Sequence, residues 1–257
     1  MLKCPKCQSG IVTATCPTCH TDLDFEQDQR EQLVFTEGVL YFPSRTQFND
    51  PFDCIAPDFS RIQAGKLEAF IRKRVAEEWP NATDAERKQK VRDMSQSPAE
   101  MERRSQEVAD YLGVLSLTSK PDSVLMWSHY ANSHKGFCLE FDTSAEPFAS
   151  ARKVQYRETR HSFDVDARPE ETATNFLLAK HKDWEYEDEW RLIAEKGREK
   201  YQYPPYVLTG VIFGSAISYA DKLKVKEWIG KGRSHPRCYL ASLAQTEFAL
   251  NIKPESS

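Results

Sequence analysis

The sequence predicts an α+β protein with a small metal-binding segment at its N-terminus. Two pairs of cysteines crowd into the first nineteen residues, apolar residues recur at helical intervals between residues 61 and 111, and alternating strand patterns mix with helices from Gly113 onward. At 257 residues the chain can hold one large domain or a domain with an appendage. We expect residues 1–24 to form the appendage, and residues 25–257 to form one α+β domain with a helical insertion at about 61–111.

Composition and charge narrow the class of protein without identifying it. Hydrophobic residues make up 40% of the chain and charged residues 29%, as in ordinary globular proteins. The formal net charge of −4 argues against strong nonspecific attraction to nucleic acid or to an anionic membrane, although a local basic patch remains compatible with it. The start of the chain, MLKCPKCQSG, lacks the apolar stretch of a signal peptide, so we expect a cytoplasmic protein with no membrane partner.

The four N-terminal cysteines have the spacing of a zinc site. Each pair is separated by two residues, which lets both sulfurs approach one ion from a tight turn, and two such turns complete the tetrahedron that zinc favours. The segment is similar to the short zinc ribbons at the ends of bacterial proteins, and it should need structural zinc to fold. Two redox pairs are the alternative, and His20 is a possible substitute ligand. The expected metal ligands are Cys4, Cys7, Cys16 and Cys19.

The first half of the α+β domain reads as one strand followed by helices. Residues 22–34 suit a linker or an amphipathic helix, and GVLYF at 38–42 suits a strand. Between 61 and 111 we expect three helices with charged, solvated outer faces. Their start signals are Thr83 with Glu86, and Ser97 with Glu100, in which a hydroxyl and an acid three residues later can satisfy free backbone amides. The apolar face of the first helix should contain Leu67, Phe70, Ile71 and Val75.

The second half mixes strands with helices. In GFCLEFD, apolar residues alternate with polar ones, which predicts a strand with one buried face formed by Phe137, Leu139 and Phe141. Helices are expected near 122–132, 168–182 and 219–229. Strands are expected at 113–118, 136–141, 152–157, 189–194, 206–213, 237–241 and 247–252.

The stretch WEYEDEWRL, residues 184–192, is the densest polar cluster of the domain. In a strand, Glu187, Glu189 and Arg191 would share one face, while Trp190 and Leu192 would face the core. Two ionised acids this close repel each other, so a base should neutralise one of them, and Arg191 or Lys180 could do so. We predict a cleft where the strand at 115–119, the helix at 122–132 and the segment at 187–191 meet.

Four motifs resemble a widespread bacterial family of unknown function that has relatives among abortive-infection proteins of phage defence. They are FNDPFDC, LMWSHYANSHKGFCLEFD, W-x-YEDEWRLI and VIFGSAIS, in this order between about residues 35 and 252. Members usually begin with a short strand of the type LYKYR, which is not evident here. The resemblance implies a bacterial protein with a role in phage defence or a toxin system, but it implies no activity.

The E-x-E step at 187–189 resembles the third motif of ADP-ribosyltransferases. That resemblance implies sheets packed as in those enzymes and NAD as the substrate, with Glu189 as the catalytic residue and Glu187 orienting the acceptor. The middle motif of these enzymes, a Ser/Thr-containing strand and a tyrosine on the next helix, is matched by Ser116, Thr118 and Ser119 with Tyr130 and His129. The first motif, a His or Arg on the opening strand, could be His20 or Arg45. The resemblance thus implies a cofactor-binding set of Tyr130, His129, Ser116 and Arg45.

Three other interpretations stay open. The acids and His129 could bind magnesium or manganese in a nuclease; the candidates are Asp50, Asp53, Glu140, Asp142, Glu187 and Glu189. The chain could be a noncatalytic module that senses a ligand or partner through the zinc ribbon. A strand acid beside an arginine could also be a purely structural ion pair. We favour an ADP-ribosyltransferase-like enzyme acting on a nucleic-acid or protein target, because four polar clusters coincide in one domain.

Overall fold

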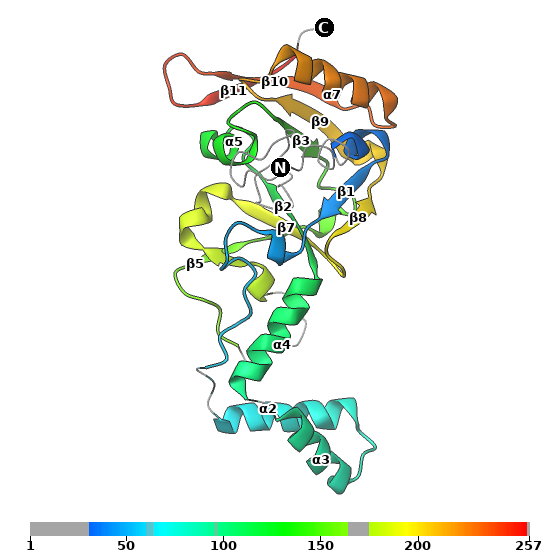
Figure 1. Cartoon of the computed structure of the whole chain (residues 1–257), viewed down its shortest axis with the longest axis vertical. Helices are drawn as coiled ribbons and strands as arrows, with labels where there is room; N and C mark the ends of the chain where they lie inside the picture. The colour runs from blue at the N-terminus through cyan, green and yellow to red at the C-terminus, as the bar shows by residue number, and fades with distance from the viewer. Residues whose placement is uncertain (1–30, 61, 63, 96, 164–174, 256–257) are drawn as a thin grey trace. The chain divides into compact units, whose positions relative to one another are not determined.

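The chain folds into two compact units that both contain helices and strands. A computed structural model describes residues 31–60, 62, 64–95, 97–163 and 175–255 (Figure 1). Unit 1 comprises Met1–Pro51, Tyr111–Val154 and Asp183–Ser257, and unit 2 comprises Phe52–Asp110 and Gln155–Lys182. The mixed α+β class is therefore confirmed. Across these ranges, no helix combines the length and apolar character needed to cross a membrane.

The described residues of unit 1 form three sheets. In the four-stranded sheet, of order β11-β10-β9-β3, β9 and β10 are parallel and are joined through α7 (Figure 1). The second sheet has the order β2-β7-β4, and the third pairs β1 with β8. The strands are β1 Val39–Phe42, β2 Gly113–Thr118, β3 Phe137–Phe141, β4 Arg152–Lys153, β7 Glu189–Ala194, β8 Glu199–Gln202, β9 Leu208–Phe213, β10 Arg237–Leu243 and β11 Leu250–Pro254. The helices are α5 Val124–Tyr130 and α7 Tyr219–Lys231, with short 3-10 turns η1 Arg45–Gln47, η2 Phe148–Ser150, η3 Lys182–Glu187 and η4 Pro205–Val207.

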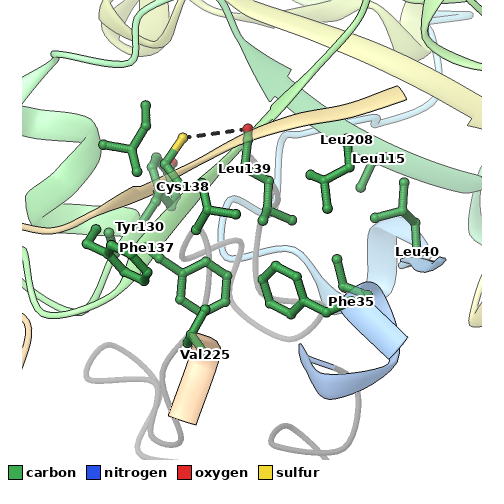
Figure 2. Packing of buried hydrophobic residues seen from close by; sticks show 14 of the residues in the cluster. Phe35, Leu40, Leu115, Tyr130, Phe137, Cys138, Leu139, Leu208 and Val225 are labelled. Atoms are coloured by element: carbon green, nitrogen blue, oxygen red, sulfur yellow. Dashed lines mark hydrogen bonds between the residues drawn. The ribbon is translucent and has the colours of Figure 1, made fainter. Parts of the chain in front are cut away.

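Aromatic rings from distant parts of the chain form the core of unit 1. Phe35, in the helical segment at 31–36, packs beside Phe137 of β3 (Figure 2), with 5.6 Å between their ring centroids. Its ring centroid also lies 6.3 Å from that of Trp228 on α7. Trp127 and Tyr130 of α5 are buried in the same cluster. Each buried aromatic side chain removes a large apolar area from water, so this cluster fixes α5 and α7 against the sheets.

Strand β3 is buried on both faces over most of its length. Phe137, Cys138 and Leu139 all lose at least 96% of their accessible surface, so the expected division into a buried and a solvent-facing side is wrong for Cys138 (Figure 2). The reason is that β3 is an edge strand of a sheet covered on both sides. Only Glu140 is exposed, as the alternation predicted.

The loop between α5 and β3 packs its backbone against the end of β9. Asn132, Ser133 and His134 have φ values of 47°, 51° and 67°, a left-handed path that returns the chain from α5 to the sheet. The amide of Gly214 donates to the carbonyl of Gly136 at 2.8 Å. A Cβ atom at position 214 would collide with the His134 carbonyl oxygen and lie 2.8 Å from that of Gly136. Only glycine permits this approach, which holds α5 and its Tyr130 in place.

Gly214→Ala should therefore destabilise the protein by about 3 kcal/mol, because the new methyl group overlaps backbone atoms that cannot move independently. Gly230 of α7 provides the matched control, since a Cβ there meets no atom within 4 Å. Gly230→Ala should stabilise the helix by up to ~1 kcal/mol. Urea unfolding followed by circular dichroism measures both changes, and equal effects of the two substitutions would contradict this packing.

Among its described residues, unit 2 has three helices and one two-stranded sheet. The helices are α2 Ala64–Glu78, α3 Asp84–Met94 and α4 Pro98–Tyr111, and the parallel strands are β5 Gln155–Arg157 and β6 Ala179–His181. Leu67, Ile71 and Val75 are buried on one face of α2 and pack with Val91 of α3, while Phe70 is half-buried beside them. The three helices and their apolar face are thus confirmed. The insertion predicted at 61–111 shares this unit with residues 155–182.

The helix starts also follow the sequence signals. The Thr83 hydroxyl accepts from the Glu86 amide, and the Glu86 carboxylate accepts from the Thr83 amide, which completes the capping box of α3. The Glu100 amide donates to the Ser97 hydroxyl at 3.2 Å at the start of α4. These caps depend on residues three positions apart, which explains why the sequence alone identifies them.

Two element predictions are wrong. Residues 152–157 form two strands in different units, because β4 pairs with β7 whereas β5 pairs with β6. The helix expected at 168–182 is wrong at its end, where β6 occupies Ala179–His181; residues 175–177 are helical, and residues 168–174 lie outside the described residues. In both places long-range strand pairing overrides the local pattern.

Candidate functional site

The candidate site is built on the antiparallel pair β2 and β7. Ser116 lies opposite Arg191, and Thr118 lies opposite Glu189. Residues that face each other across two strands point to the same side of the sheet, so these four side chains share one face. Strands at 113–118 and 189–194 had been predicted with these same bounds, and both are confirmed.

Glu189 and Arg191 form a two-pronged ion pair in the interior. The Arg191 Nε atom donates to Glu189 Oε1 and its Nη2 atom donates to Glu189 Oε2, each at 3.0 Å. Both side chains have no exposed surface. Positions two apart in a strand lie on one face, which makes this geometry possible within a single strand. Arg191 is therefore the base that neutralises one acid of the E-x-E step, as expected, and it fixes the carboxylate in one orientation.

Glu187 is held by a residue of α5. The Tyr130 hydroxyl donates to Glu187 Oε1, and both side chains are buried. Burial, and then the negative charge of Glu187, raise the pKa of Tyr130 well above its ordinary value. The contact joins α5 to the chain just before β7. The three segments predicted to surround a cleft therefore meet here, whereas the cleft itself stays a prediction.

The raised pKa of Tyr130 gives an alkaline test of this contact. The folded state holds the phenolic proton more tightly than the unfolded state, so the group contributes stability that is full below about pH 10 and is lost as the pH rises above it. Tyr130→Phe should reduce the slope of unfolding free energy against pH by up to ~1.4 kcal/mol per pH unit above pH ~10. Urea unfolding at several alkaline pH values measures it.

Tyr219→Phe is the control for this titration, because Tyr219 is 73% exposed. The slope of unfolding free energy against pH for Tyr219→Phe should match that of the wild type. A Tyr130→Phe slope equal to the wild-type slope would contradict the tight retention of the Tyr130 proton.

Asp188 separates the two glutamates and changes the direction of the chain. Its φ is 44°, in the left-handed region, so Glu187 ends η3 while Glu189 begins β7. The prediction that Glu187 shares a strand with Glu189 and Arg191 is wrong for this reason. The Asp188 carboxylate accepts from Ser119 and lies 2.8 Å from Lys153 Nζ, and Lys153 first, then Ser119, lowers the Asp188 pKa.

The buried face of β7 also differs from expectation. Glu189 and Arg191 are fully buried, and Leu192 is nearly so. Trp190, which was expected to face the core, is only half-buried. The strand thus has interior contacts on both sides, and its charged face is not its solvent face. Because water is excluded there, the electrostatic interactions of this face are stronger than on a surface.

Ser116 supplies a hydroxyl with unused hydrogen-bonding capacity. It is 2% exposed, and its Oγ atom has no hydrogen-bond partner among the residues that the structure describes. Arg191 is its neighbour across the strand pair. Buried hydroxyls normally find a partner, so a ligand group or water is the natural complement of this atom.

The other predicted site residues do not contact Glu187, Glu189 or Arg191 in the contacts described above. His129 is exposed, with its ring centroid 6.2 Å from that of Tyr130 and 6.3 Å from that of Tyr186. Arg45 begins η1 after Ser44, which bridges to Gly113 at the end of β2 remote from Thr118. The predicted zinc ligands Cys4, Cys7, Cys16 and Cys19, and His20, lie outside the described residues.

The acids proposed for a nuclease metal site have separate local partners. Asp53 lies 3.5 Å from Lys180 Nζ in the interior of unit 2. Lys180 therefore does form a buried ion pair, but with Asp53 and not with a glutamate of the E-x-E step, as the sequence had suggested. Glu140 accepts from Thr209, and Asp142 from Ser144. Within the described ranges, no group of three or more His, Cys, Asp or Glu side chains is arranged to hold a metal ion.

Sequence reasoning missed one supporting contact. The Thr118 hydroxyl donates to the Glu187 backbone carbonyl, which ties the end of β2 to the turn before β7. A threonine at the end of a strand carries no signal for a partner 69 residues away. Only the strand register brings the two groups together.

A comparison with family models gives one match. Residues 126–192 match a family described as "Protein of unknown function (DUF2971)". The match begins in α5 and ends in β7, so it contains Tyr130, Glu187, Glu189 and Arg191, whereas Ser116 precedes it. It is shorter than the extent of about 35–252 expected from the motifs. Comparisons with curated proteins and with solved structures give no match.

Proposed function

We propose that the protein is an NAD-dependent ADP-ribosyltransferase-like enzyme with Glu189 as its catalytic residue. One observation carries the proposal: two glutamates, an arginine and a tyrosine are paired in the interior, beside a buried serine hydroxyl with unused hydrogen-bonding capacity. The β2–β7 pair brings Ser116 and Thr118 into register with Arg191 and Glu189, as the analogy with the E-x-E and Ser/Thr motifs requires.

The energetics support a functional role for this cluster. Removing charged groups from water is costly, and a buried ion pair is often no more stabilising than apolar residues of equal volume. Buried clusters of charged side chains are found most often at active sites, where catalysis needs a charge held in one position. Arg191 keeps the Glu189 carboxylate ionised and oriented, which is the state required to stabilise a positive transition state.

The chemistry follows from these roles. The bond between the ribose C1′ atom and the nicotinamide nitrogen breaks, and nicotinamide leaves with both electrons of that bond. The Glu189 carboxylate stabilises the positive charge that develops on the ribose, as carboxylates do in glycoside cleavage. A nucleophile of the acceptor then bonds to C1′ and loses its proton to a base, with Glu187 orienting that acceptor. Ser116, Tyr130, His129 and Arg45 are proposed to hold the dinucleotide.

The contacts of the acids favour this function over a metal-dependent nuclease. Both oxygens of Glu189 accept from Arg191, and Glu187 accepts from Tyr130. A metal would have to displace a guanidinium from Glu189 in the interior, which disrupts a buried pair. We propose a nucleic-acid or protein acceptor, in the setting of phage defence or a toxin system in a bacterial cytoplasm.

The direct test is to incubate the full chain with NAD labelled in the adenylate half, together with bacterial RNA, DNA and protein as acceptors. Nicotinamide release with transfer of the label to a macromolecule is expected. Release without transfer would identify a glycohydrolase and overturn the transferase. Nucleic-acid cleavage under magnesium without nicotinamide release would instead favour the nuclease, and neither result would favour a noncatalytic module.

We also propose that residues 1–24 form a zinc ribbon with structural zinc on Cys4, Cys7, Cys16 and Cys19. Elemental analysis of protein purified without chelator should find about one zinc per chain. Cys7→Ser together with Cys16→Ser should remove the metal, because one ligand is lost from each pair. Cys238→Ser is the control and should retain it. Zinc content that survives the double substitution would disprove the assignment.

A further inference from the structure

A surface groove of unit 1 is lined by basic and aromatic side chains that the proposed enzyme site does not use. Its volume is about 760 Å³. Two arginines, Arg233 and Arg237, and His235 between them lie along the segment that enters β10, and all three are exposed. Tyr206 in η4, which is 70% exposed, and Tyr239 on β10 add two rings. The remaining lining residues are Glu140, Pro205, Leu208 and Thr209.

The two arginines present separate positive charges to the groove. The chain bends at Arg233 and becomes a strand at Arg237, and Ser234 behind Arg233 is 4% exposed. Two separate positive charges suit a ligand with more than one negative charge better than they suit a single small anion.

The two arginines are not engaged by acids of the protein. The side chains of Arg233, His235 and Arg237 make no hydrogen bond or ion pair with any residue in the part of the chain that the structure describes. Elsewhere, exposed basic side chains commonly have such partners: Arg72 pairs with Glu68, and Lys231 with Glu227. In a chain with 39 acids against 35 lysines and arginines, two unmatched arginines in one groove depart from the general pattern.

Gly210 lies beneath side chains that line the groove. In the strand register, Gly210 of β9 lies between Glu140 on β3 and Arg237 on β10. A Cβ atom at position 210 would lie 2.6 Å from Glu140 Oε2 and 3.2 Å from the Tyr239 ring. The side chains of Glu140 and Tyr239 therefore cover Gly210, and both line the groove together with Arg237.

We propose that this groove binds single-stranded nucleic acid. Proteins that bind single strands combine a basic track for the phosphates with aromatic side chains on which bases stack, and the groove contains both. The net charge of −4 keeps the rest of the surface from attracting nucleic acid strongly, so binding should depend on these few residues. The proposal stands apart from the enzymatic one, because none of its residues belongs to the buried cluster on β2 and β7.

The test measures fluorescence anisotropy of a labelled oligothymidylate of ~10 nucleotides with the full chain at ~50 mM salt. Replacing Arg233 and Arg237 together by alanine should weaken binding by ~tenfold or more and should lower the slope of log affinity against log salt by about 1.4, which is 0.7 for each of two phosphate contacts. Replacing Lys73 and Lys88 together by alanine is the control. It removes the same charge from exposed positions on α2 and α3 and should leave binding unchanged.

The aromatic contribution is tested at Tyr206, which is 70% exposed and therefore adds little to the packing of the core. Circular dichroism checks that its variants are folded. Tyr206→Phe should keep the affinity, whereas Tyr206→Ser should weaken it by ~fivefold or more. Ultraviolet crosslinking should attach the oligonucleotide to the peptides that contain Tyr206 or Tyr239.

Several outcomes would overturn the proposal. They are the absence of oligonucleotide binding at ~50 mM salt, equal binding by the wild type and the Arg233 and Arg237 double variant, and tighter binding of duplex than of single strand. Displacement of the oligonucleotide by an oligoglutamate of equal charge at equal concentration would assign the groove to an acidic protein partner instead. None of these measurements depends on nicotinamide release, so a failure here and a failure of the enzymatic proposal are distinguishable.

Discussion

Glu189→Gln should lower the rate of nicotinamide release by about 100- to 1000-fold, the usual loss when one fixed group that stabilises transition-state charge is removed. Glutamine keeps the shape of the side chain but removes the negative charge that would face the developing cation on the ribose. The affinity for NAD, measured by calorimetry, should change little, because the lost interaction forms only in the transition state. The effect should therefore appear in kcat.

Glu195→Gln is the matched control, because Glu195 follows β7 directly and is exposed. It should release nicotinamide at the wild-type rate. Since Glu189→Gln also alters a buried pair, both variants are to be assayed at a temperature where circular dichroism shows them folded. Release by folded Glu189→Gln at the wild-type rate would remove Glu189 from the catalytic role and end the enzymatic proposal in its present form.

Arg191→Met should lower the free energy of unfolding by about 3–5 kcal/mol. Methionine fills a similar volume, but the Glu189 carboxylate loses the guanidinium that compensates its charge in a site with no exposed surface. Urea unfolding monitored by circular dichroism measures this loss. Combining Arg191→Met with Glu189→Gln should cost less than the sum of the single changes, with an interaction energy of about 0.5–3 kcal/mol.

An exposed ion pair gives the comparison. Lys231 and Glu227 lie 2.5 Å apart on α7 with exposed fractions of 57% and 62%. Lys231→Met should therefore change stability by no more than ~0.5 kcal/mol, because solvent screens the pair. Comparable effects of Lys231→Met and Arg191→Met would show that the Glu189–Arg191 pair is not buried in solution.

Elements that depend on neighbours in the sequence could be predicted, whereas those that depend on distant partners could not. The helices α2, α3 and α4 follow from apolar spacing and from capping pairs three residues apart. Strand β8 was not predicted, because it exists through pairing with β1, far away in the chain. Strand β6 lies where the end of a helix was expected for the same reason, because it pairs with β5.

The site shows the same division. The pairing of Glu189 with Arg191 agrees with strand alternation, and the sequence offered Arg191, with Lys180 as the alternative, as the partner of one of the two acids. The contact of Tyr130 with Glu187 joins groups 57 residues apart, and no local rule specifies it. The position of Glu187 depends on the left-handed conformation of Asp188, a residue type that adopts this conformation only occasionally, so the break between η3 and β7 had no clear signal.

The division of the chain into interleaved segments has a consequence for biosynthesis. Unit 2 consists of Phe52–Asp110 and Gln155–Lys182, so all of its residues are synthesised, and later emerge from the ribosome, before those of β7. In unit 1, β1 must wait for β8, and β2 for β7. Because domains tend to fold as soon as their residues emerge, unit 2 should mature first during translation, while the strand that carries Thr118 remains unpaired until β7 has emerged.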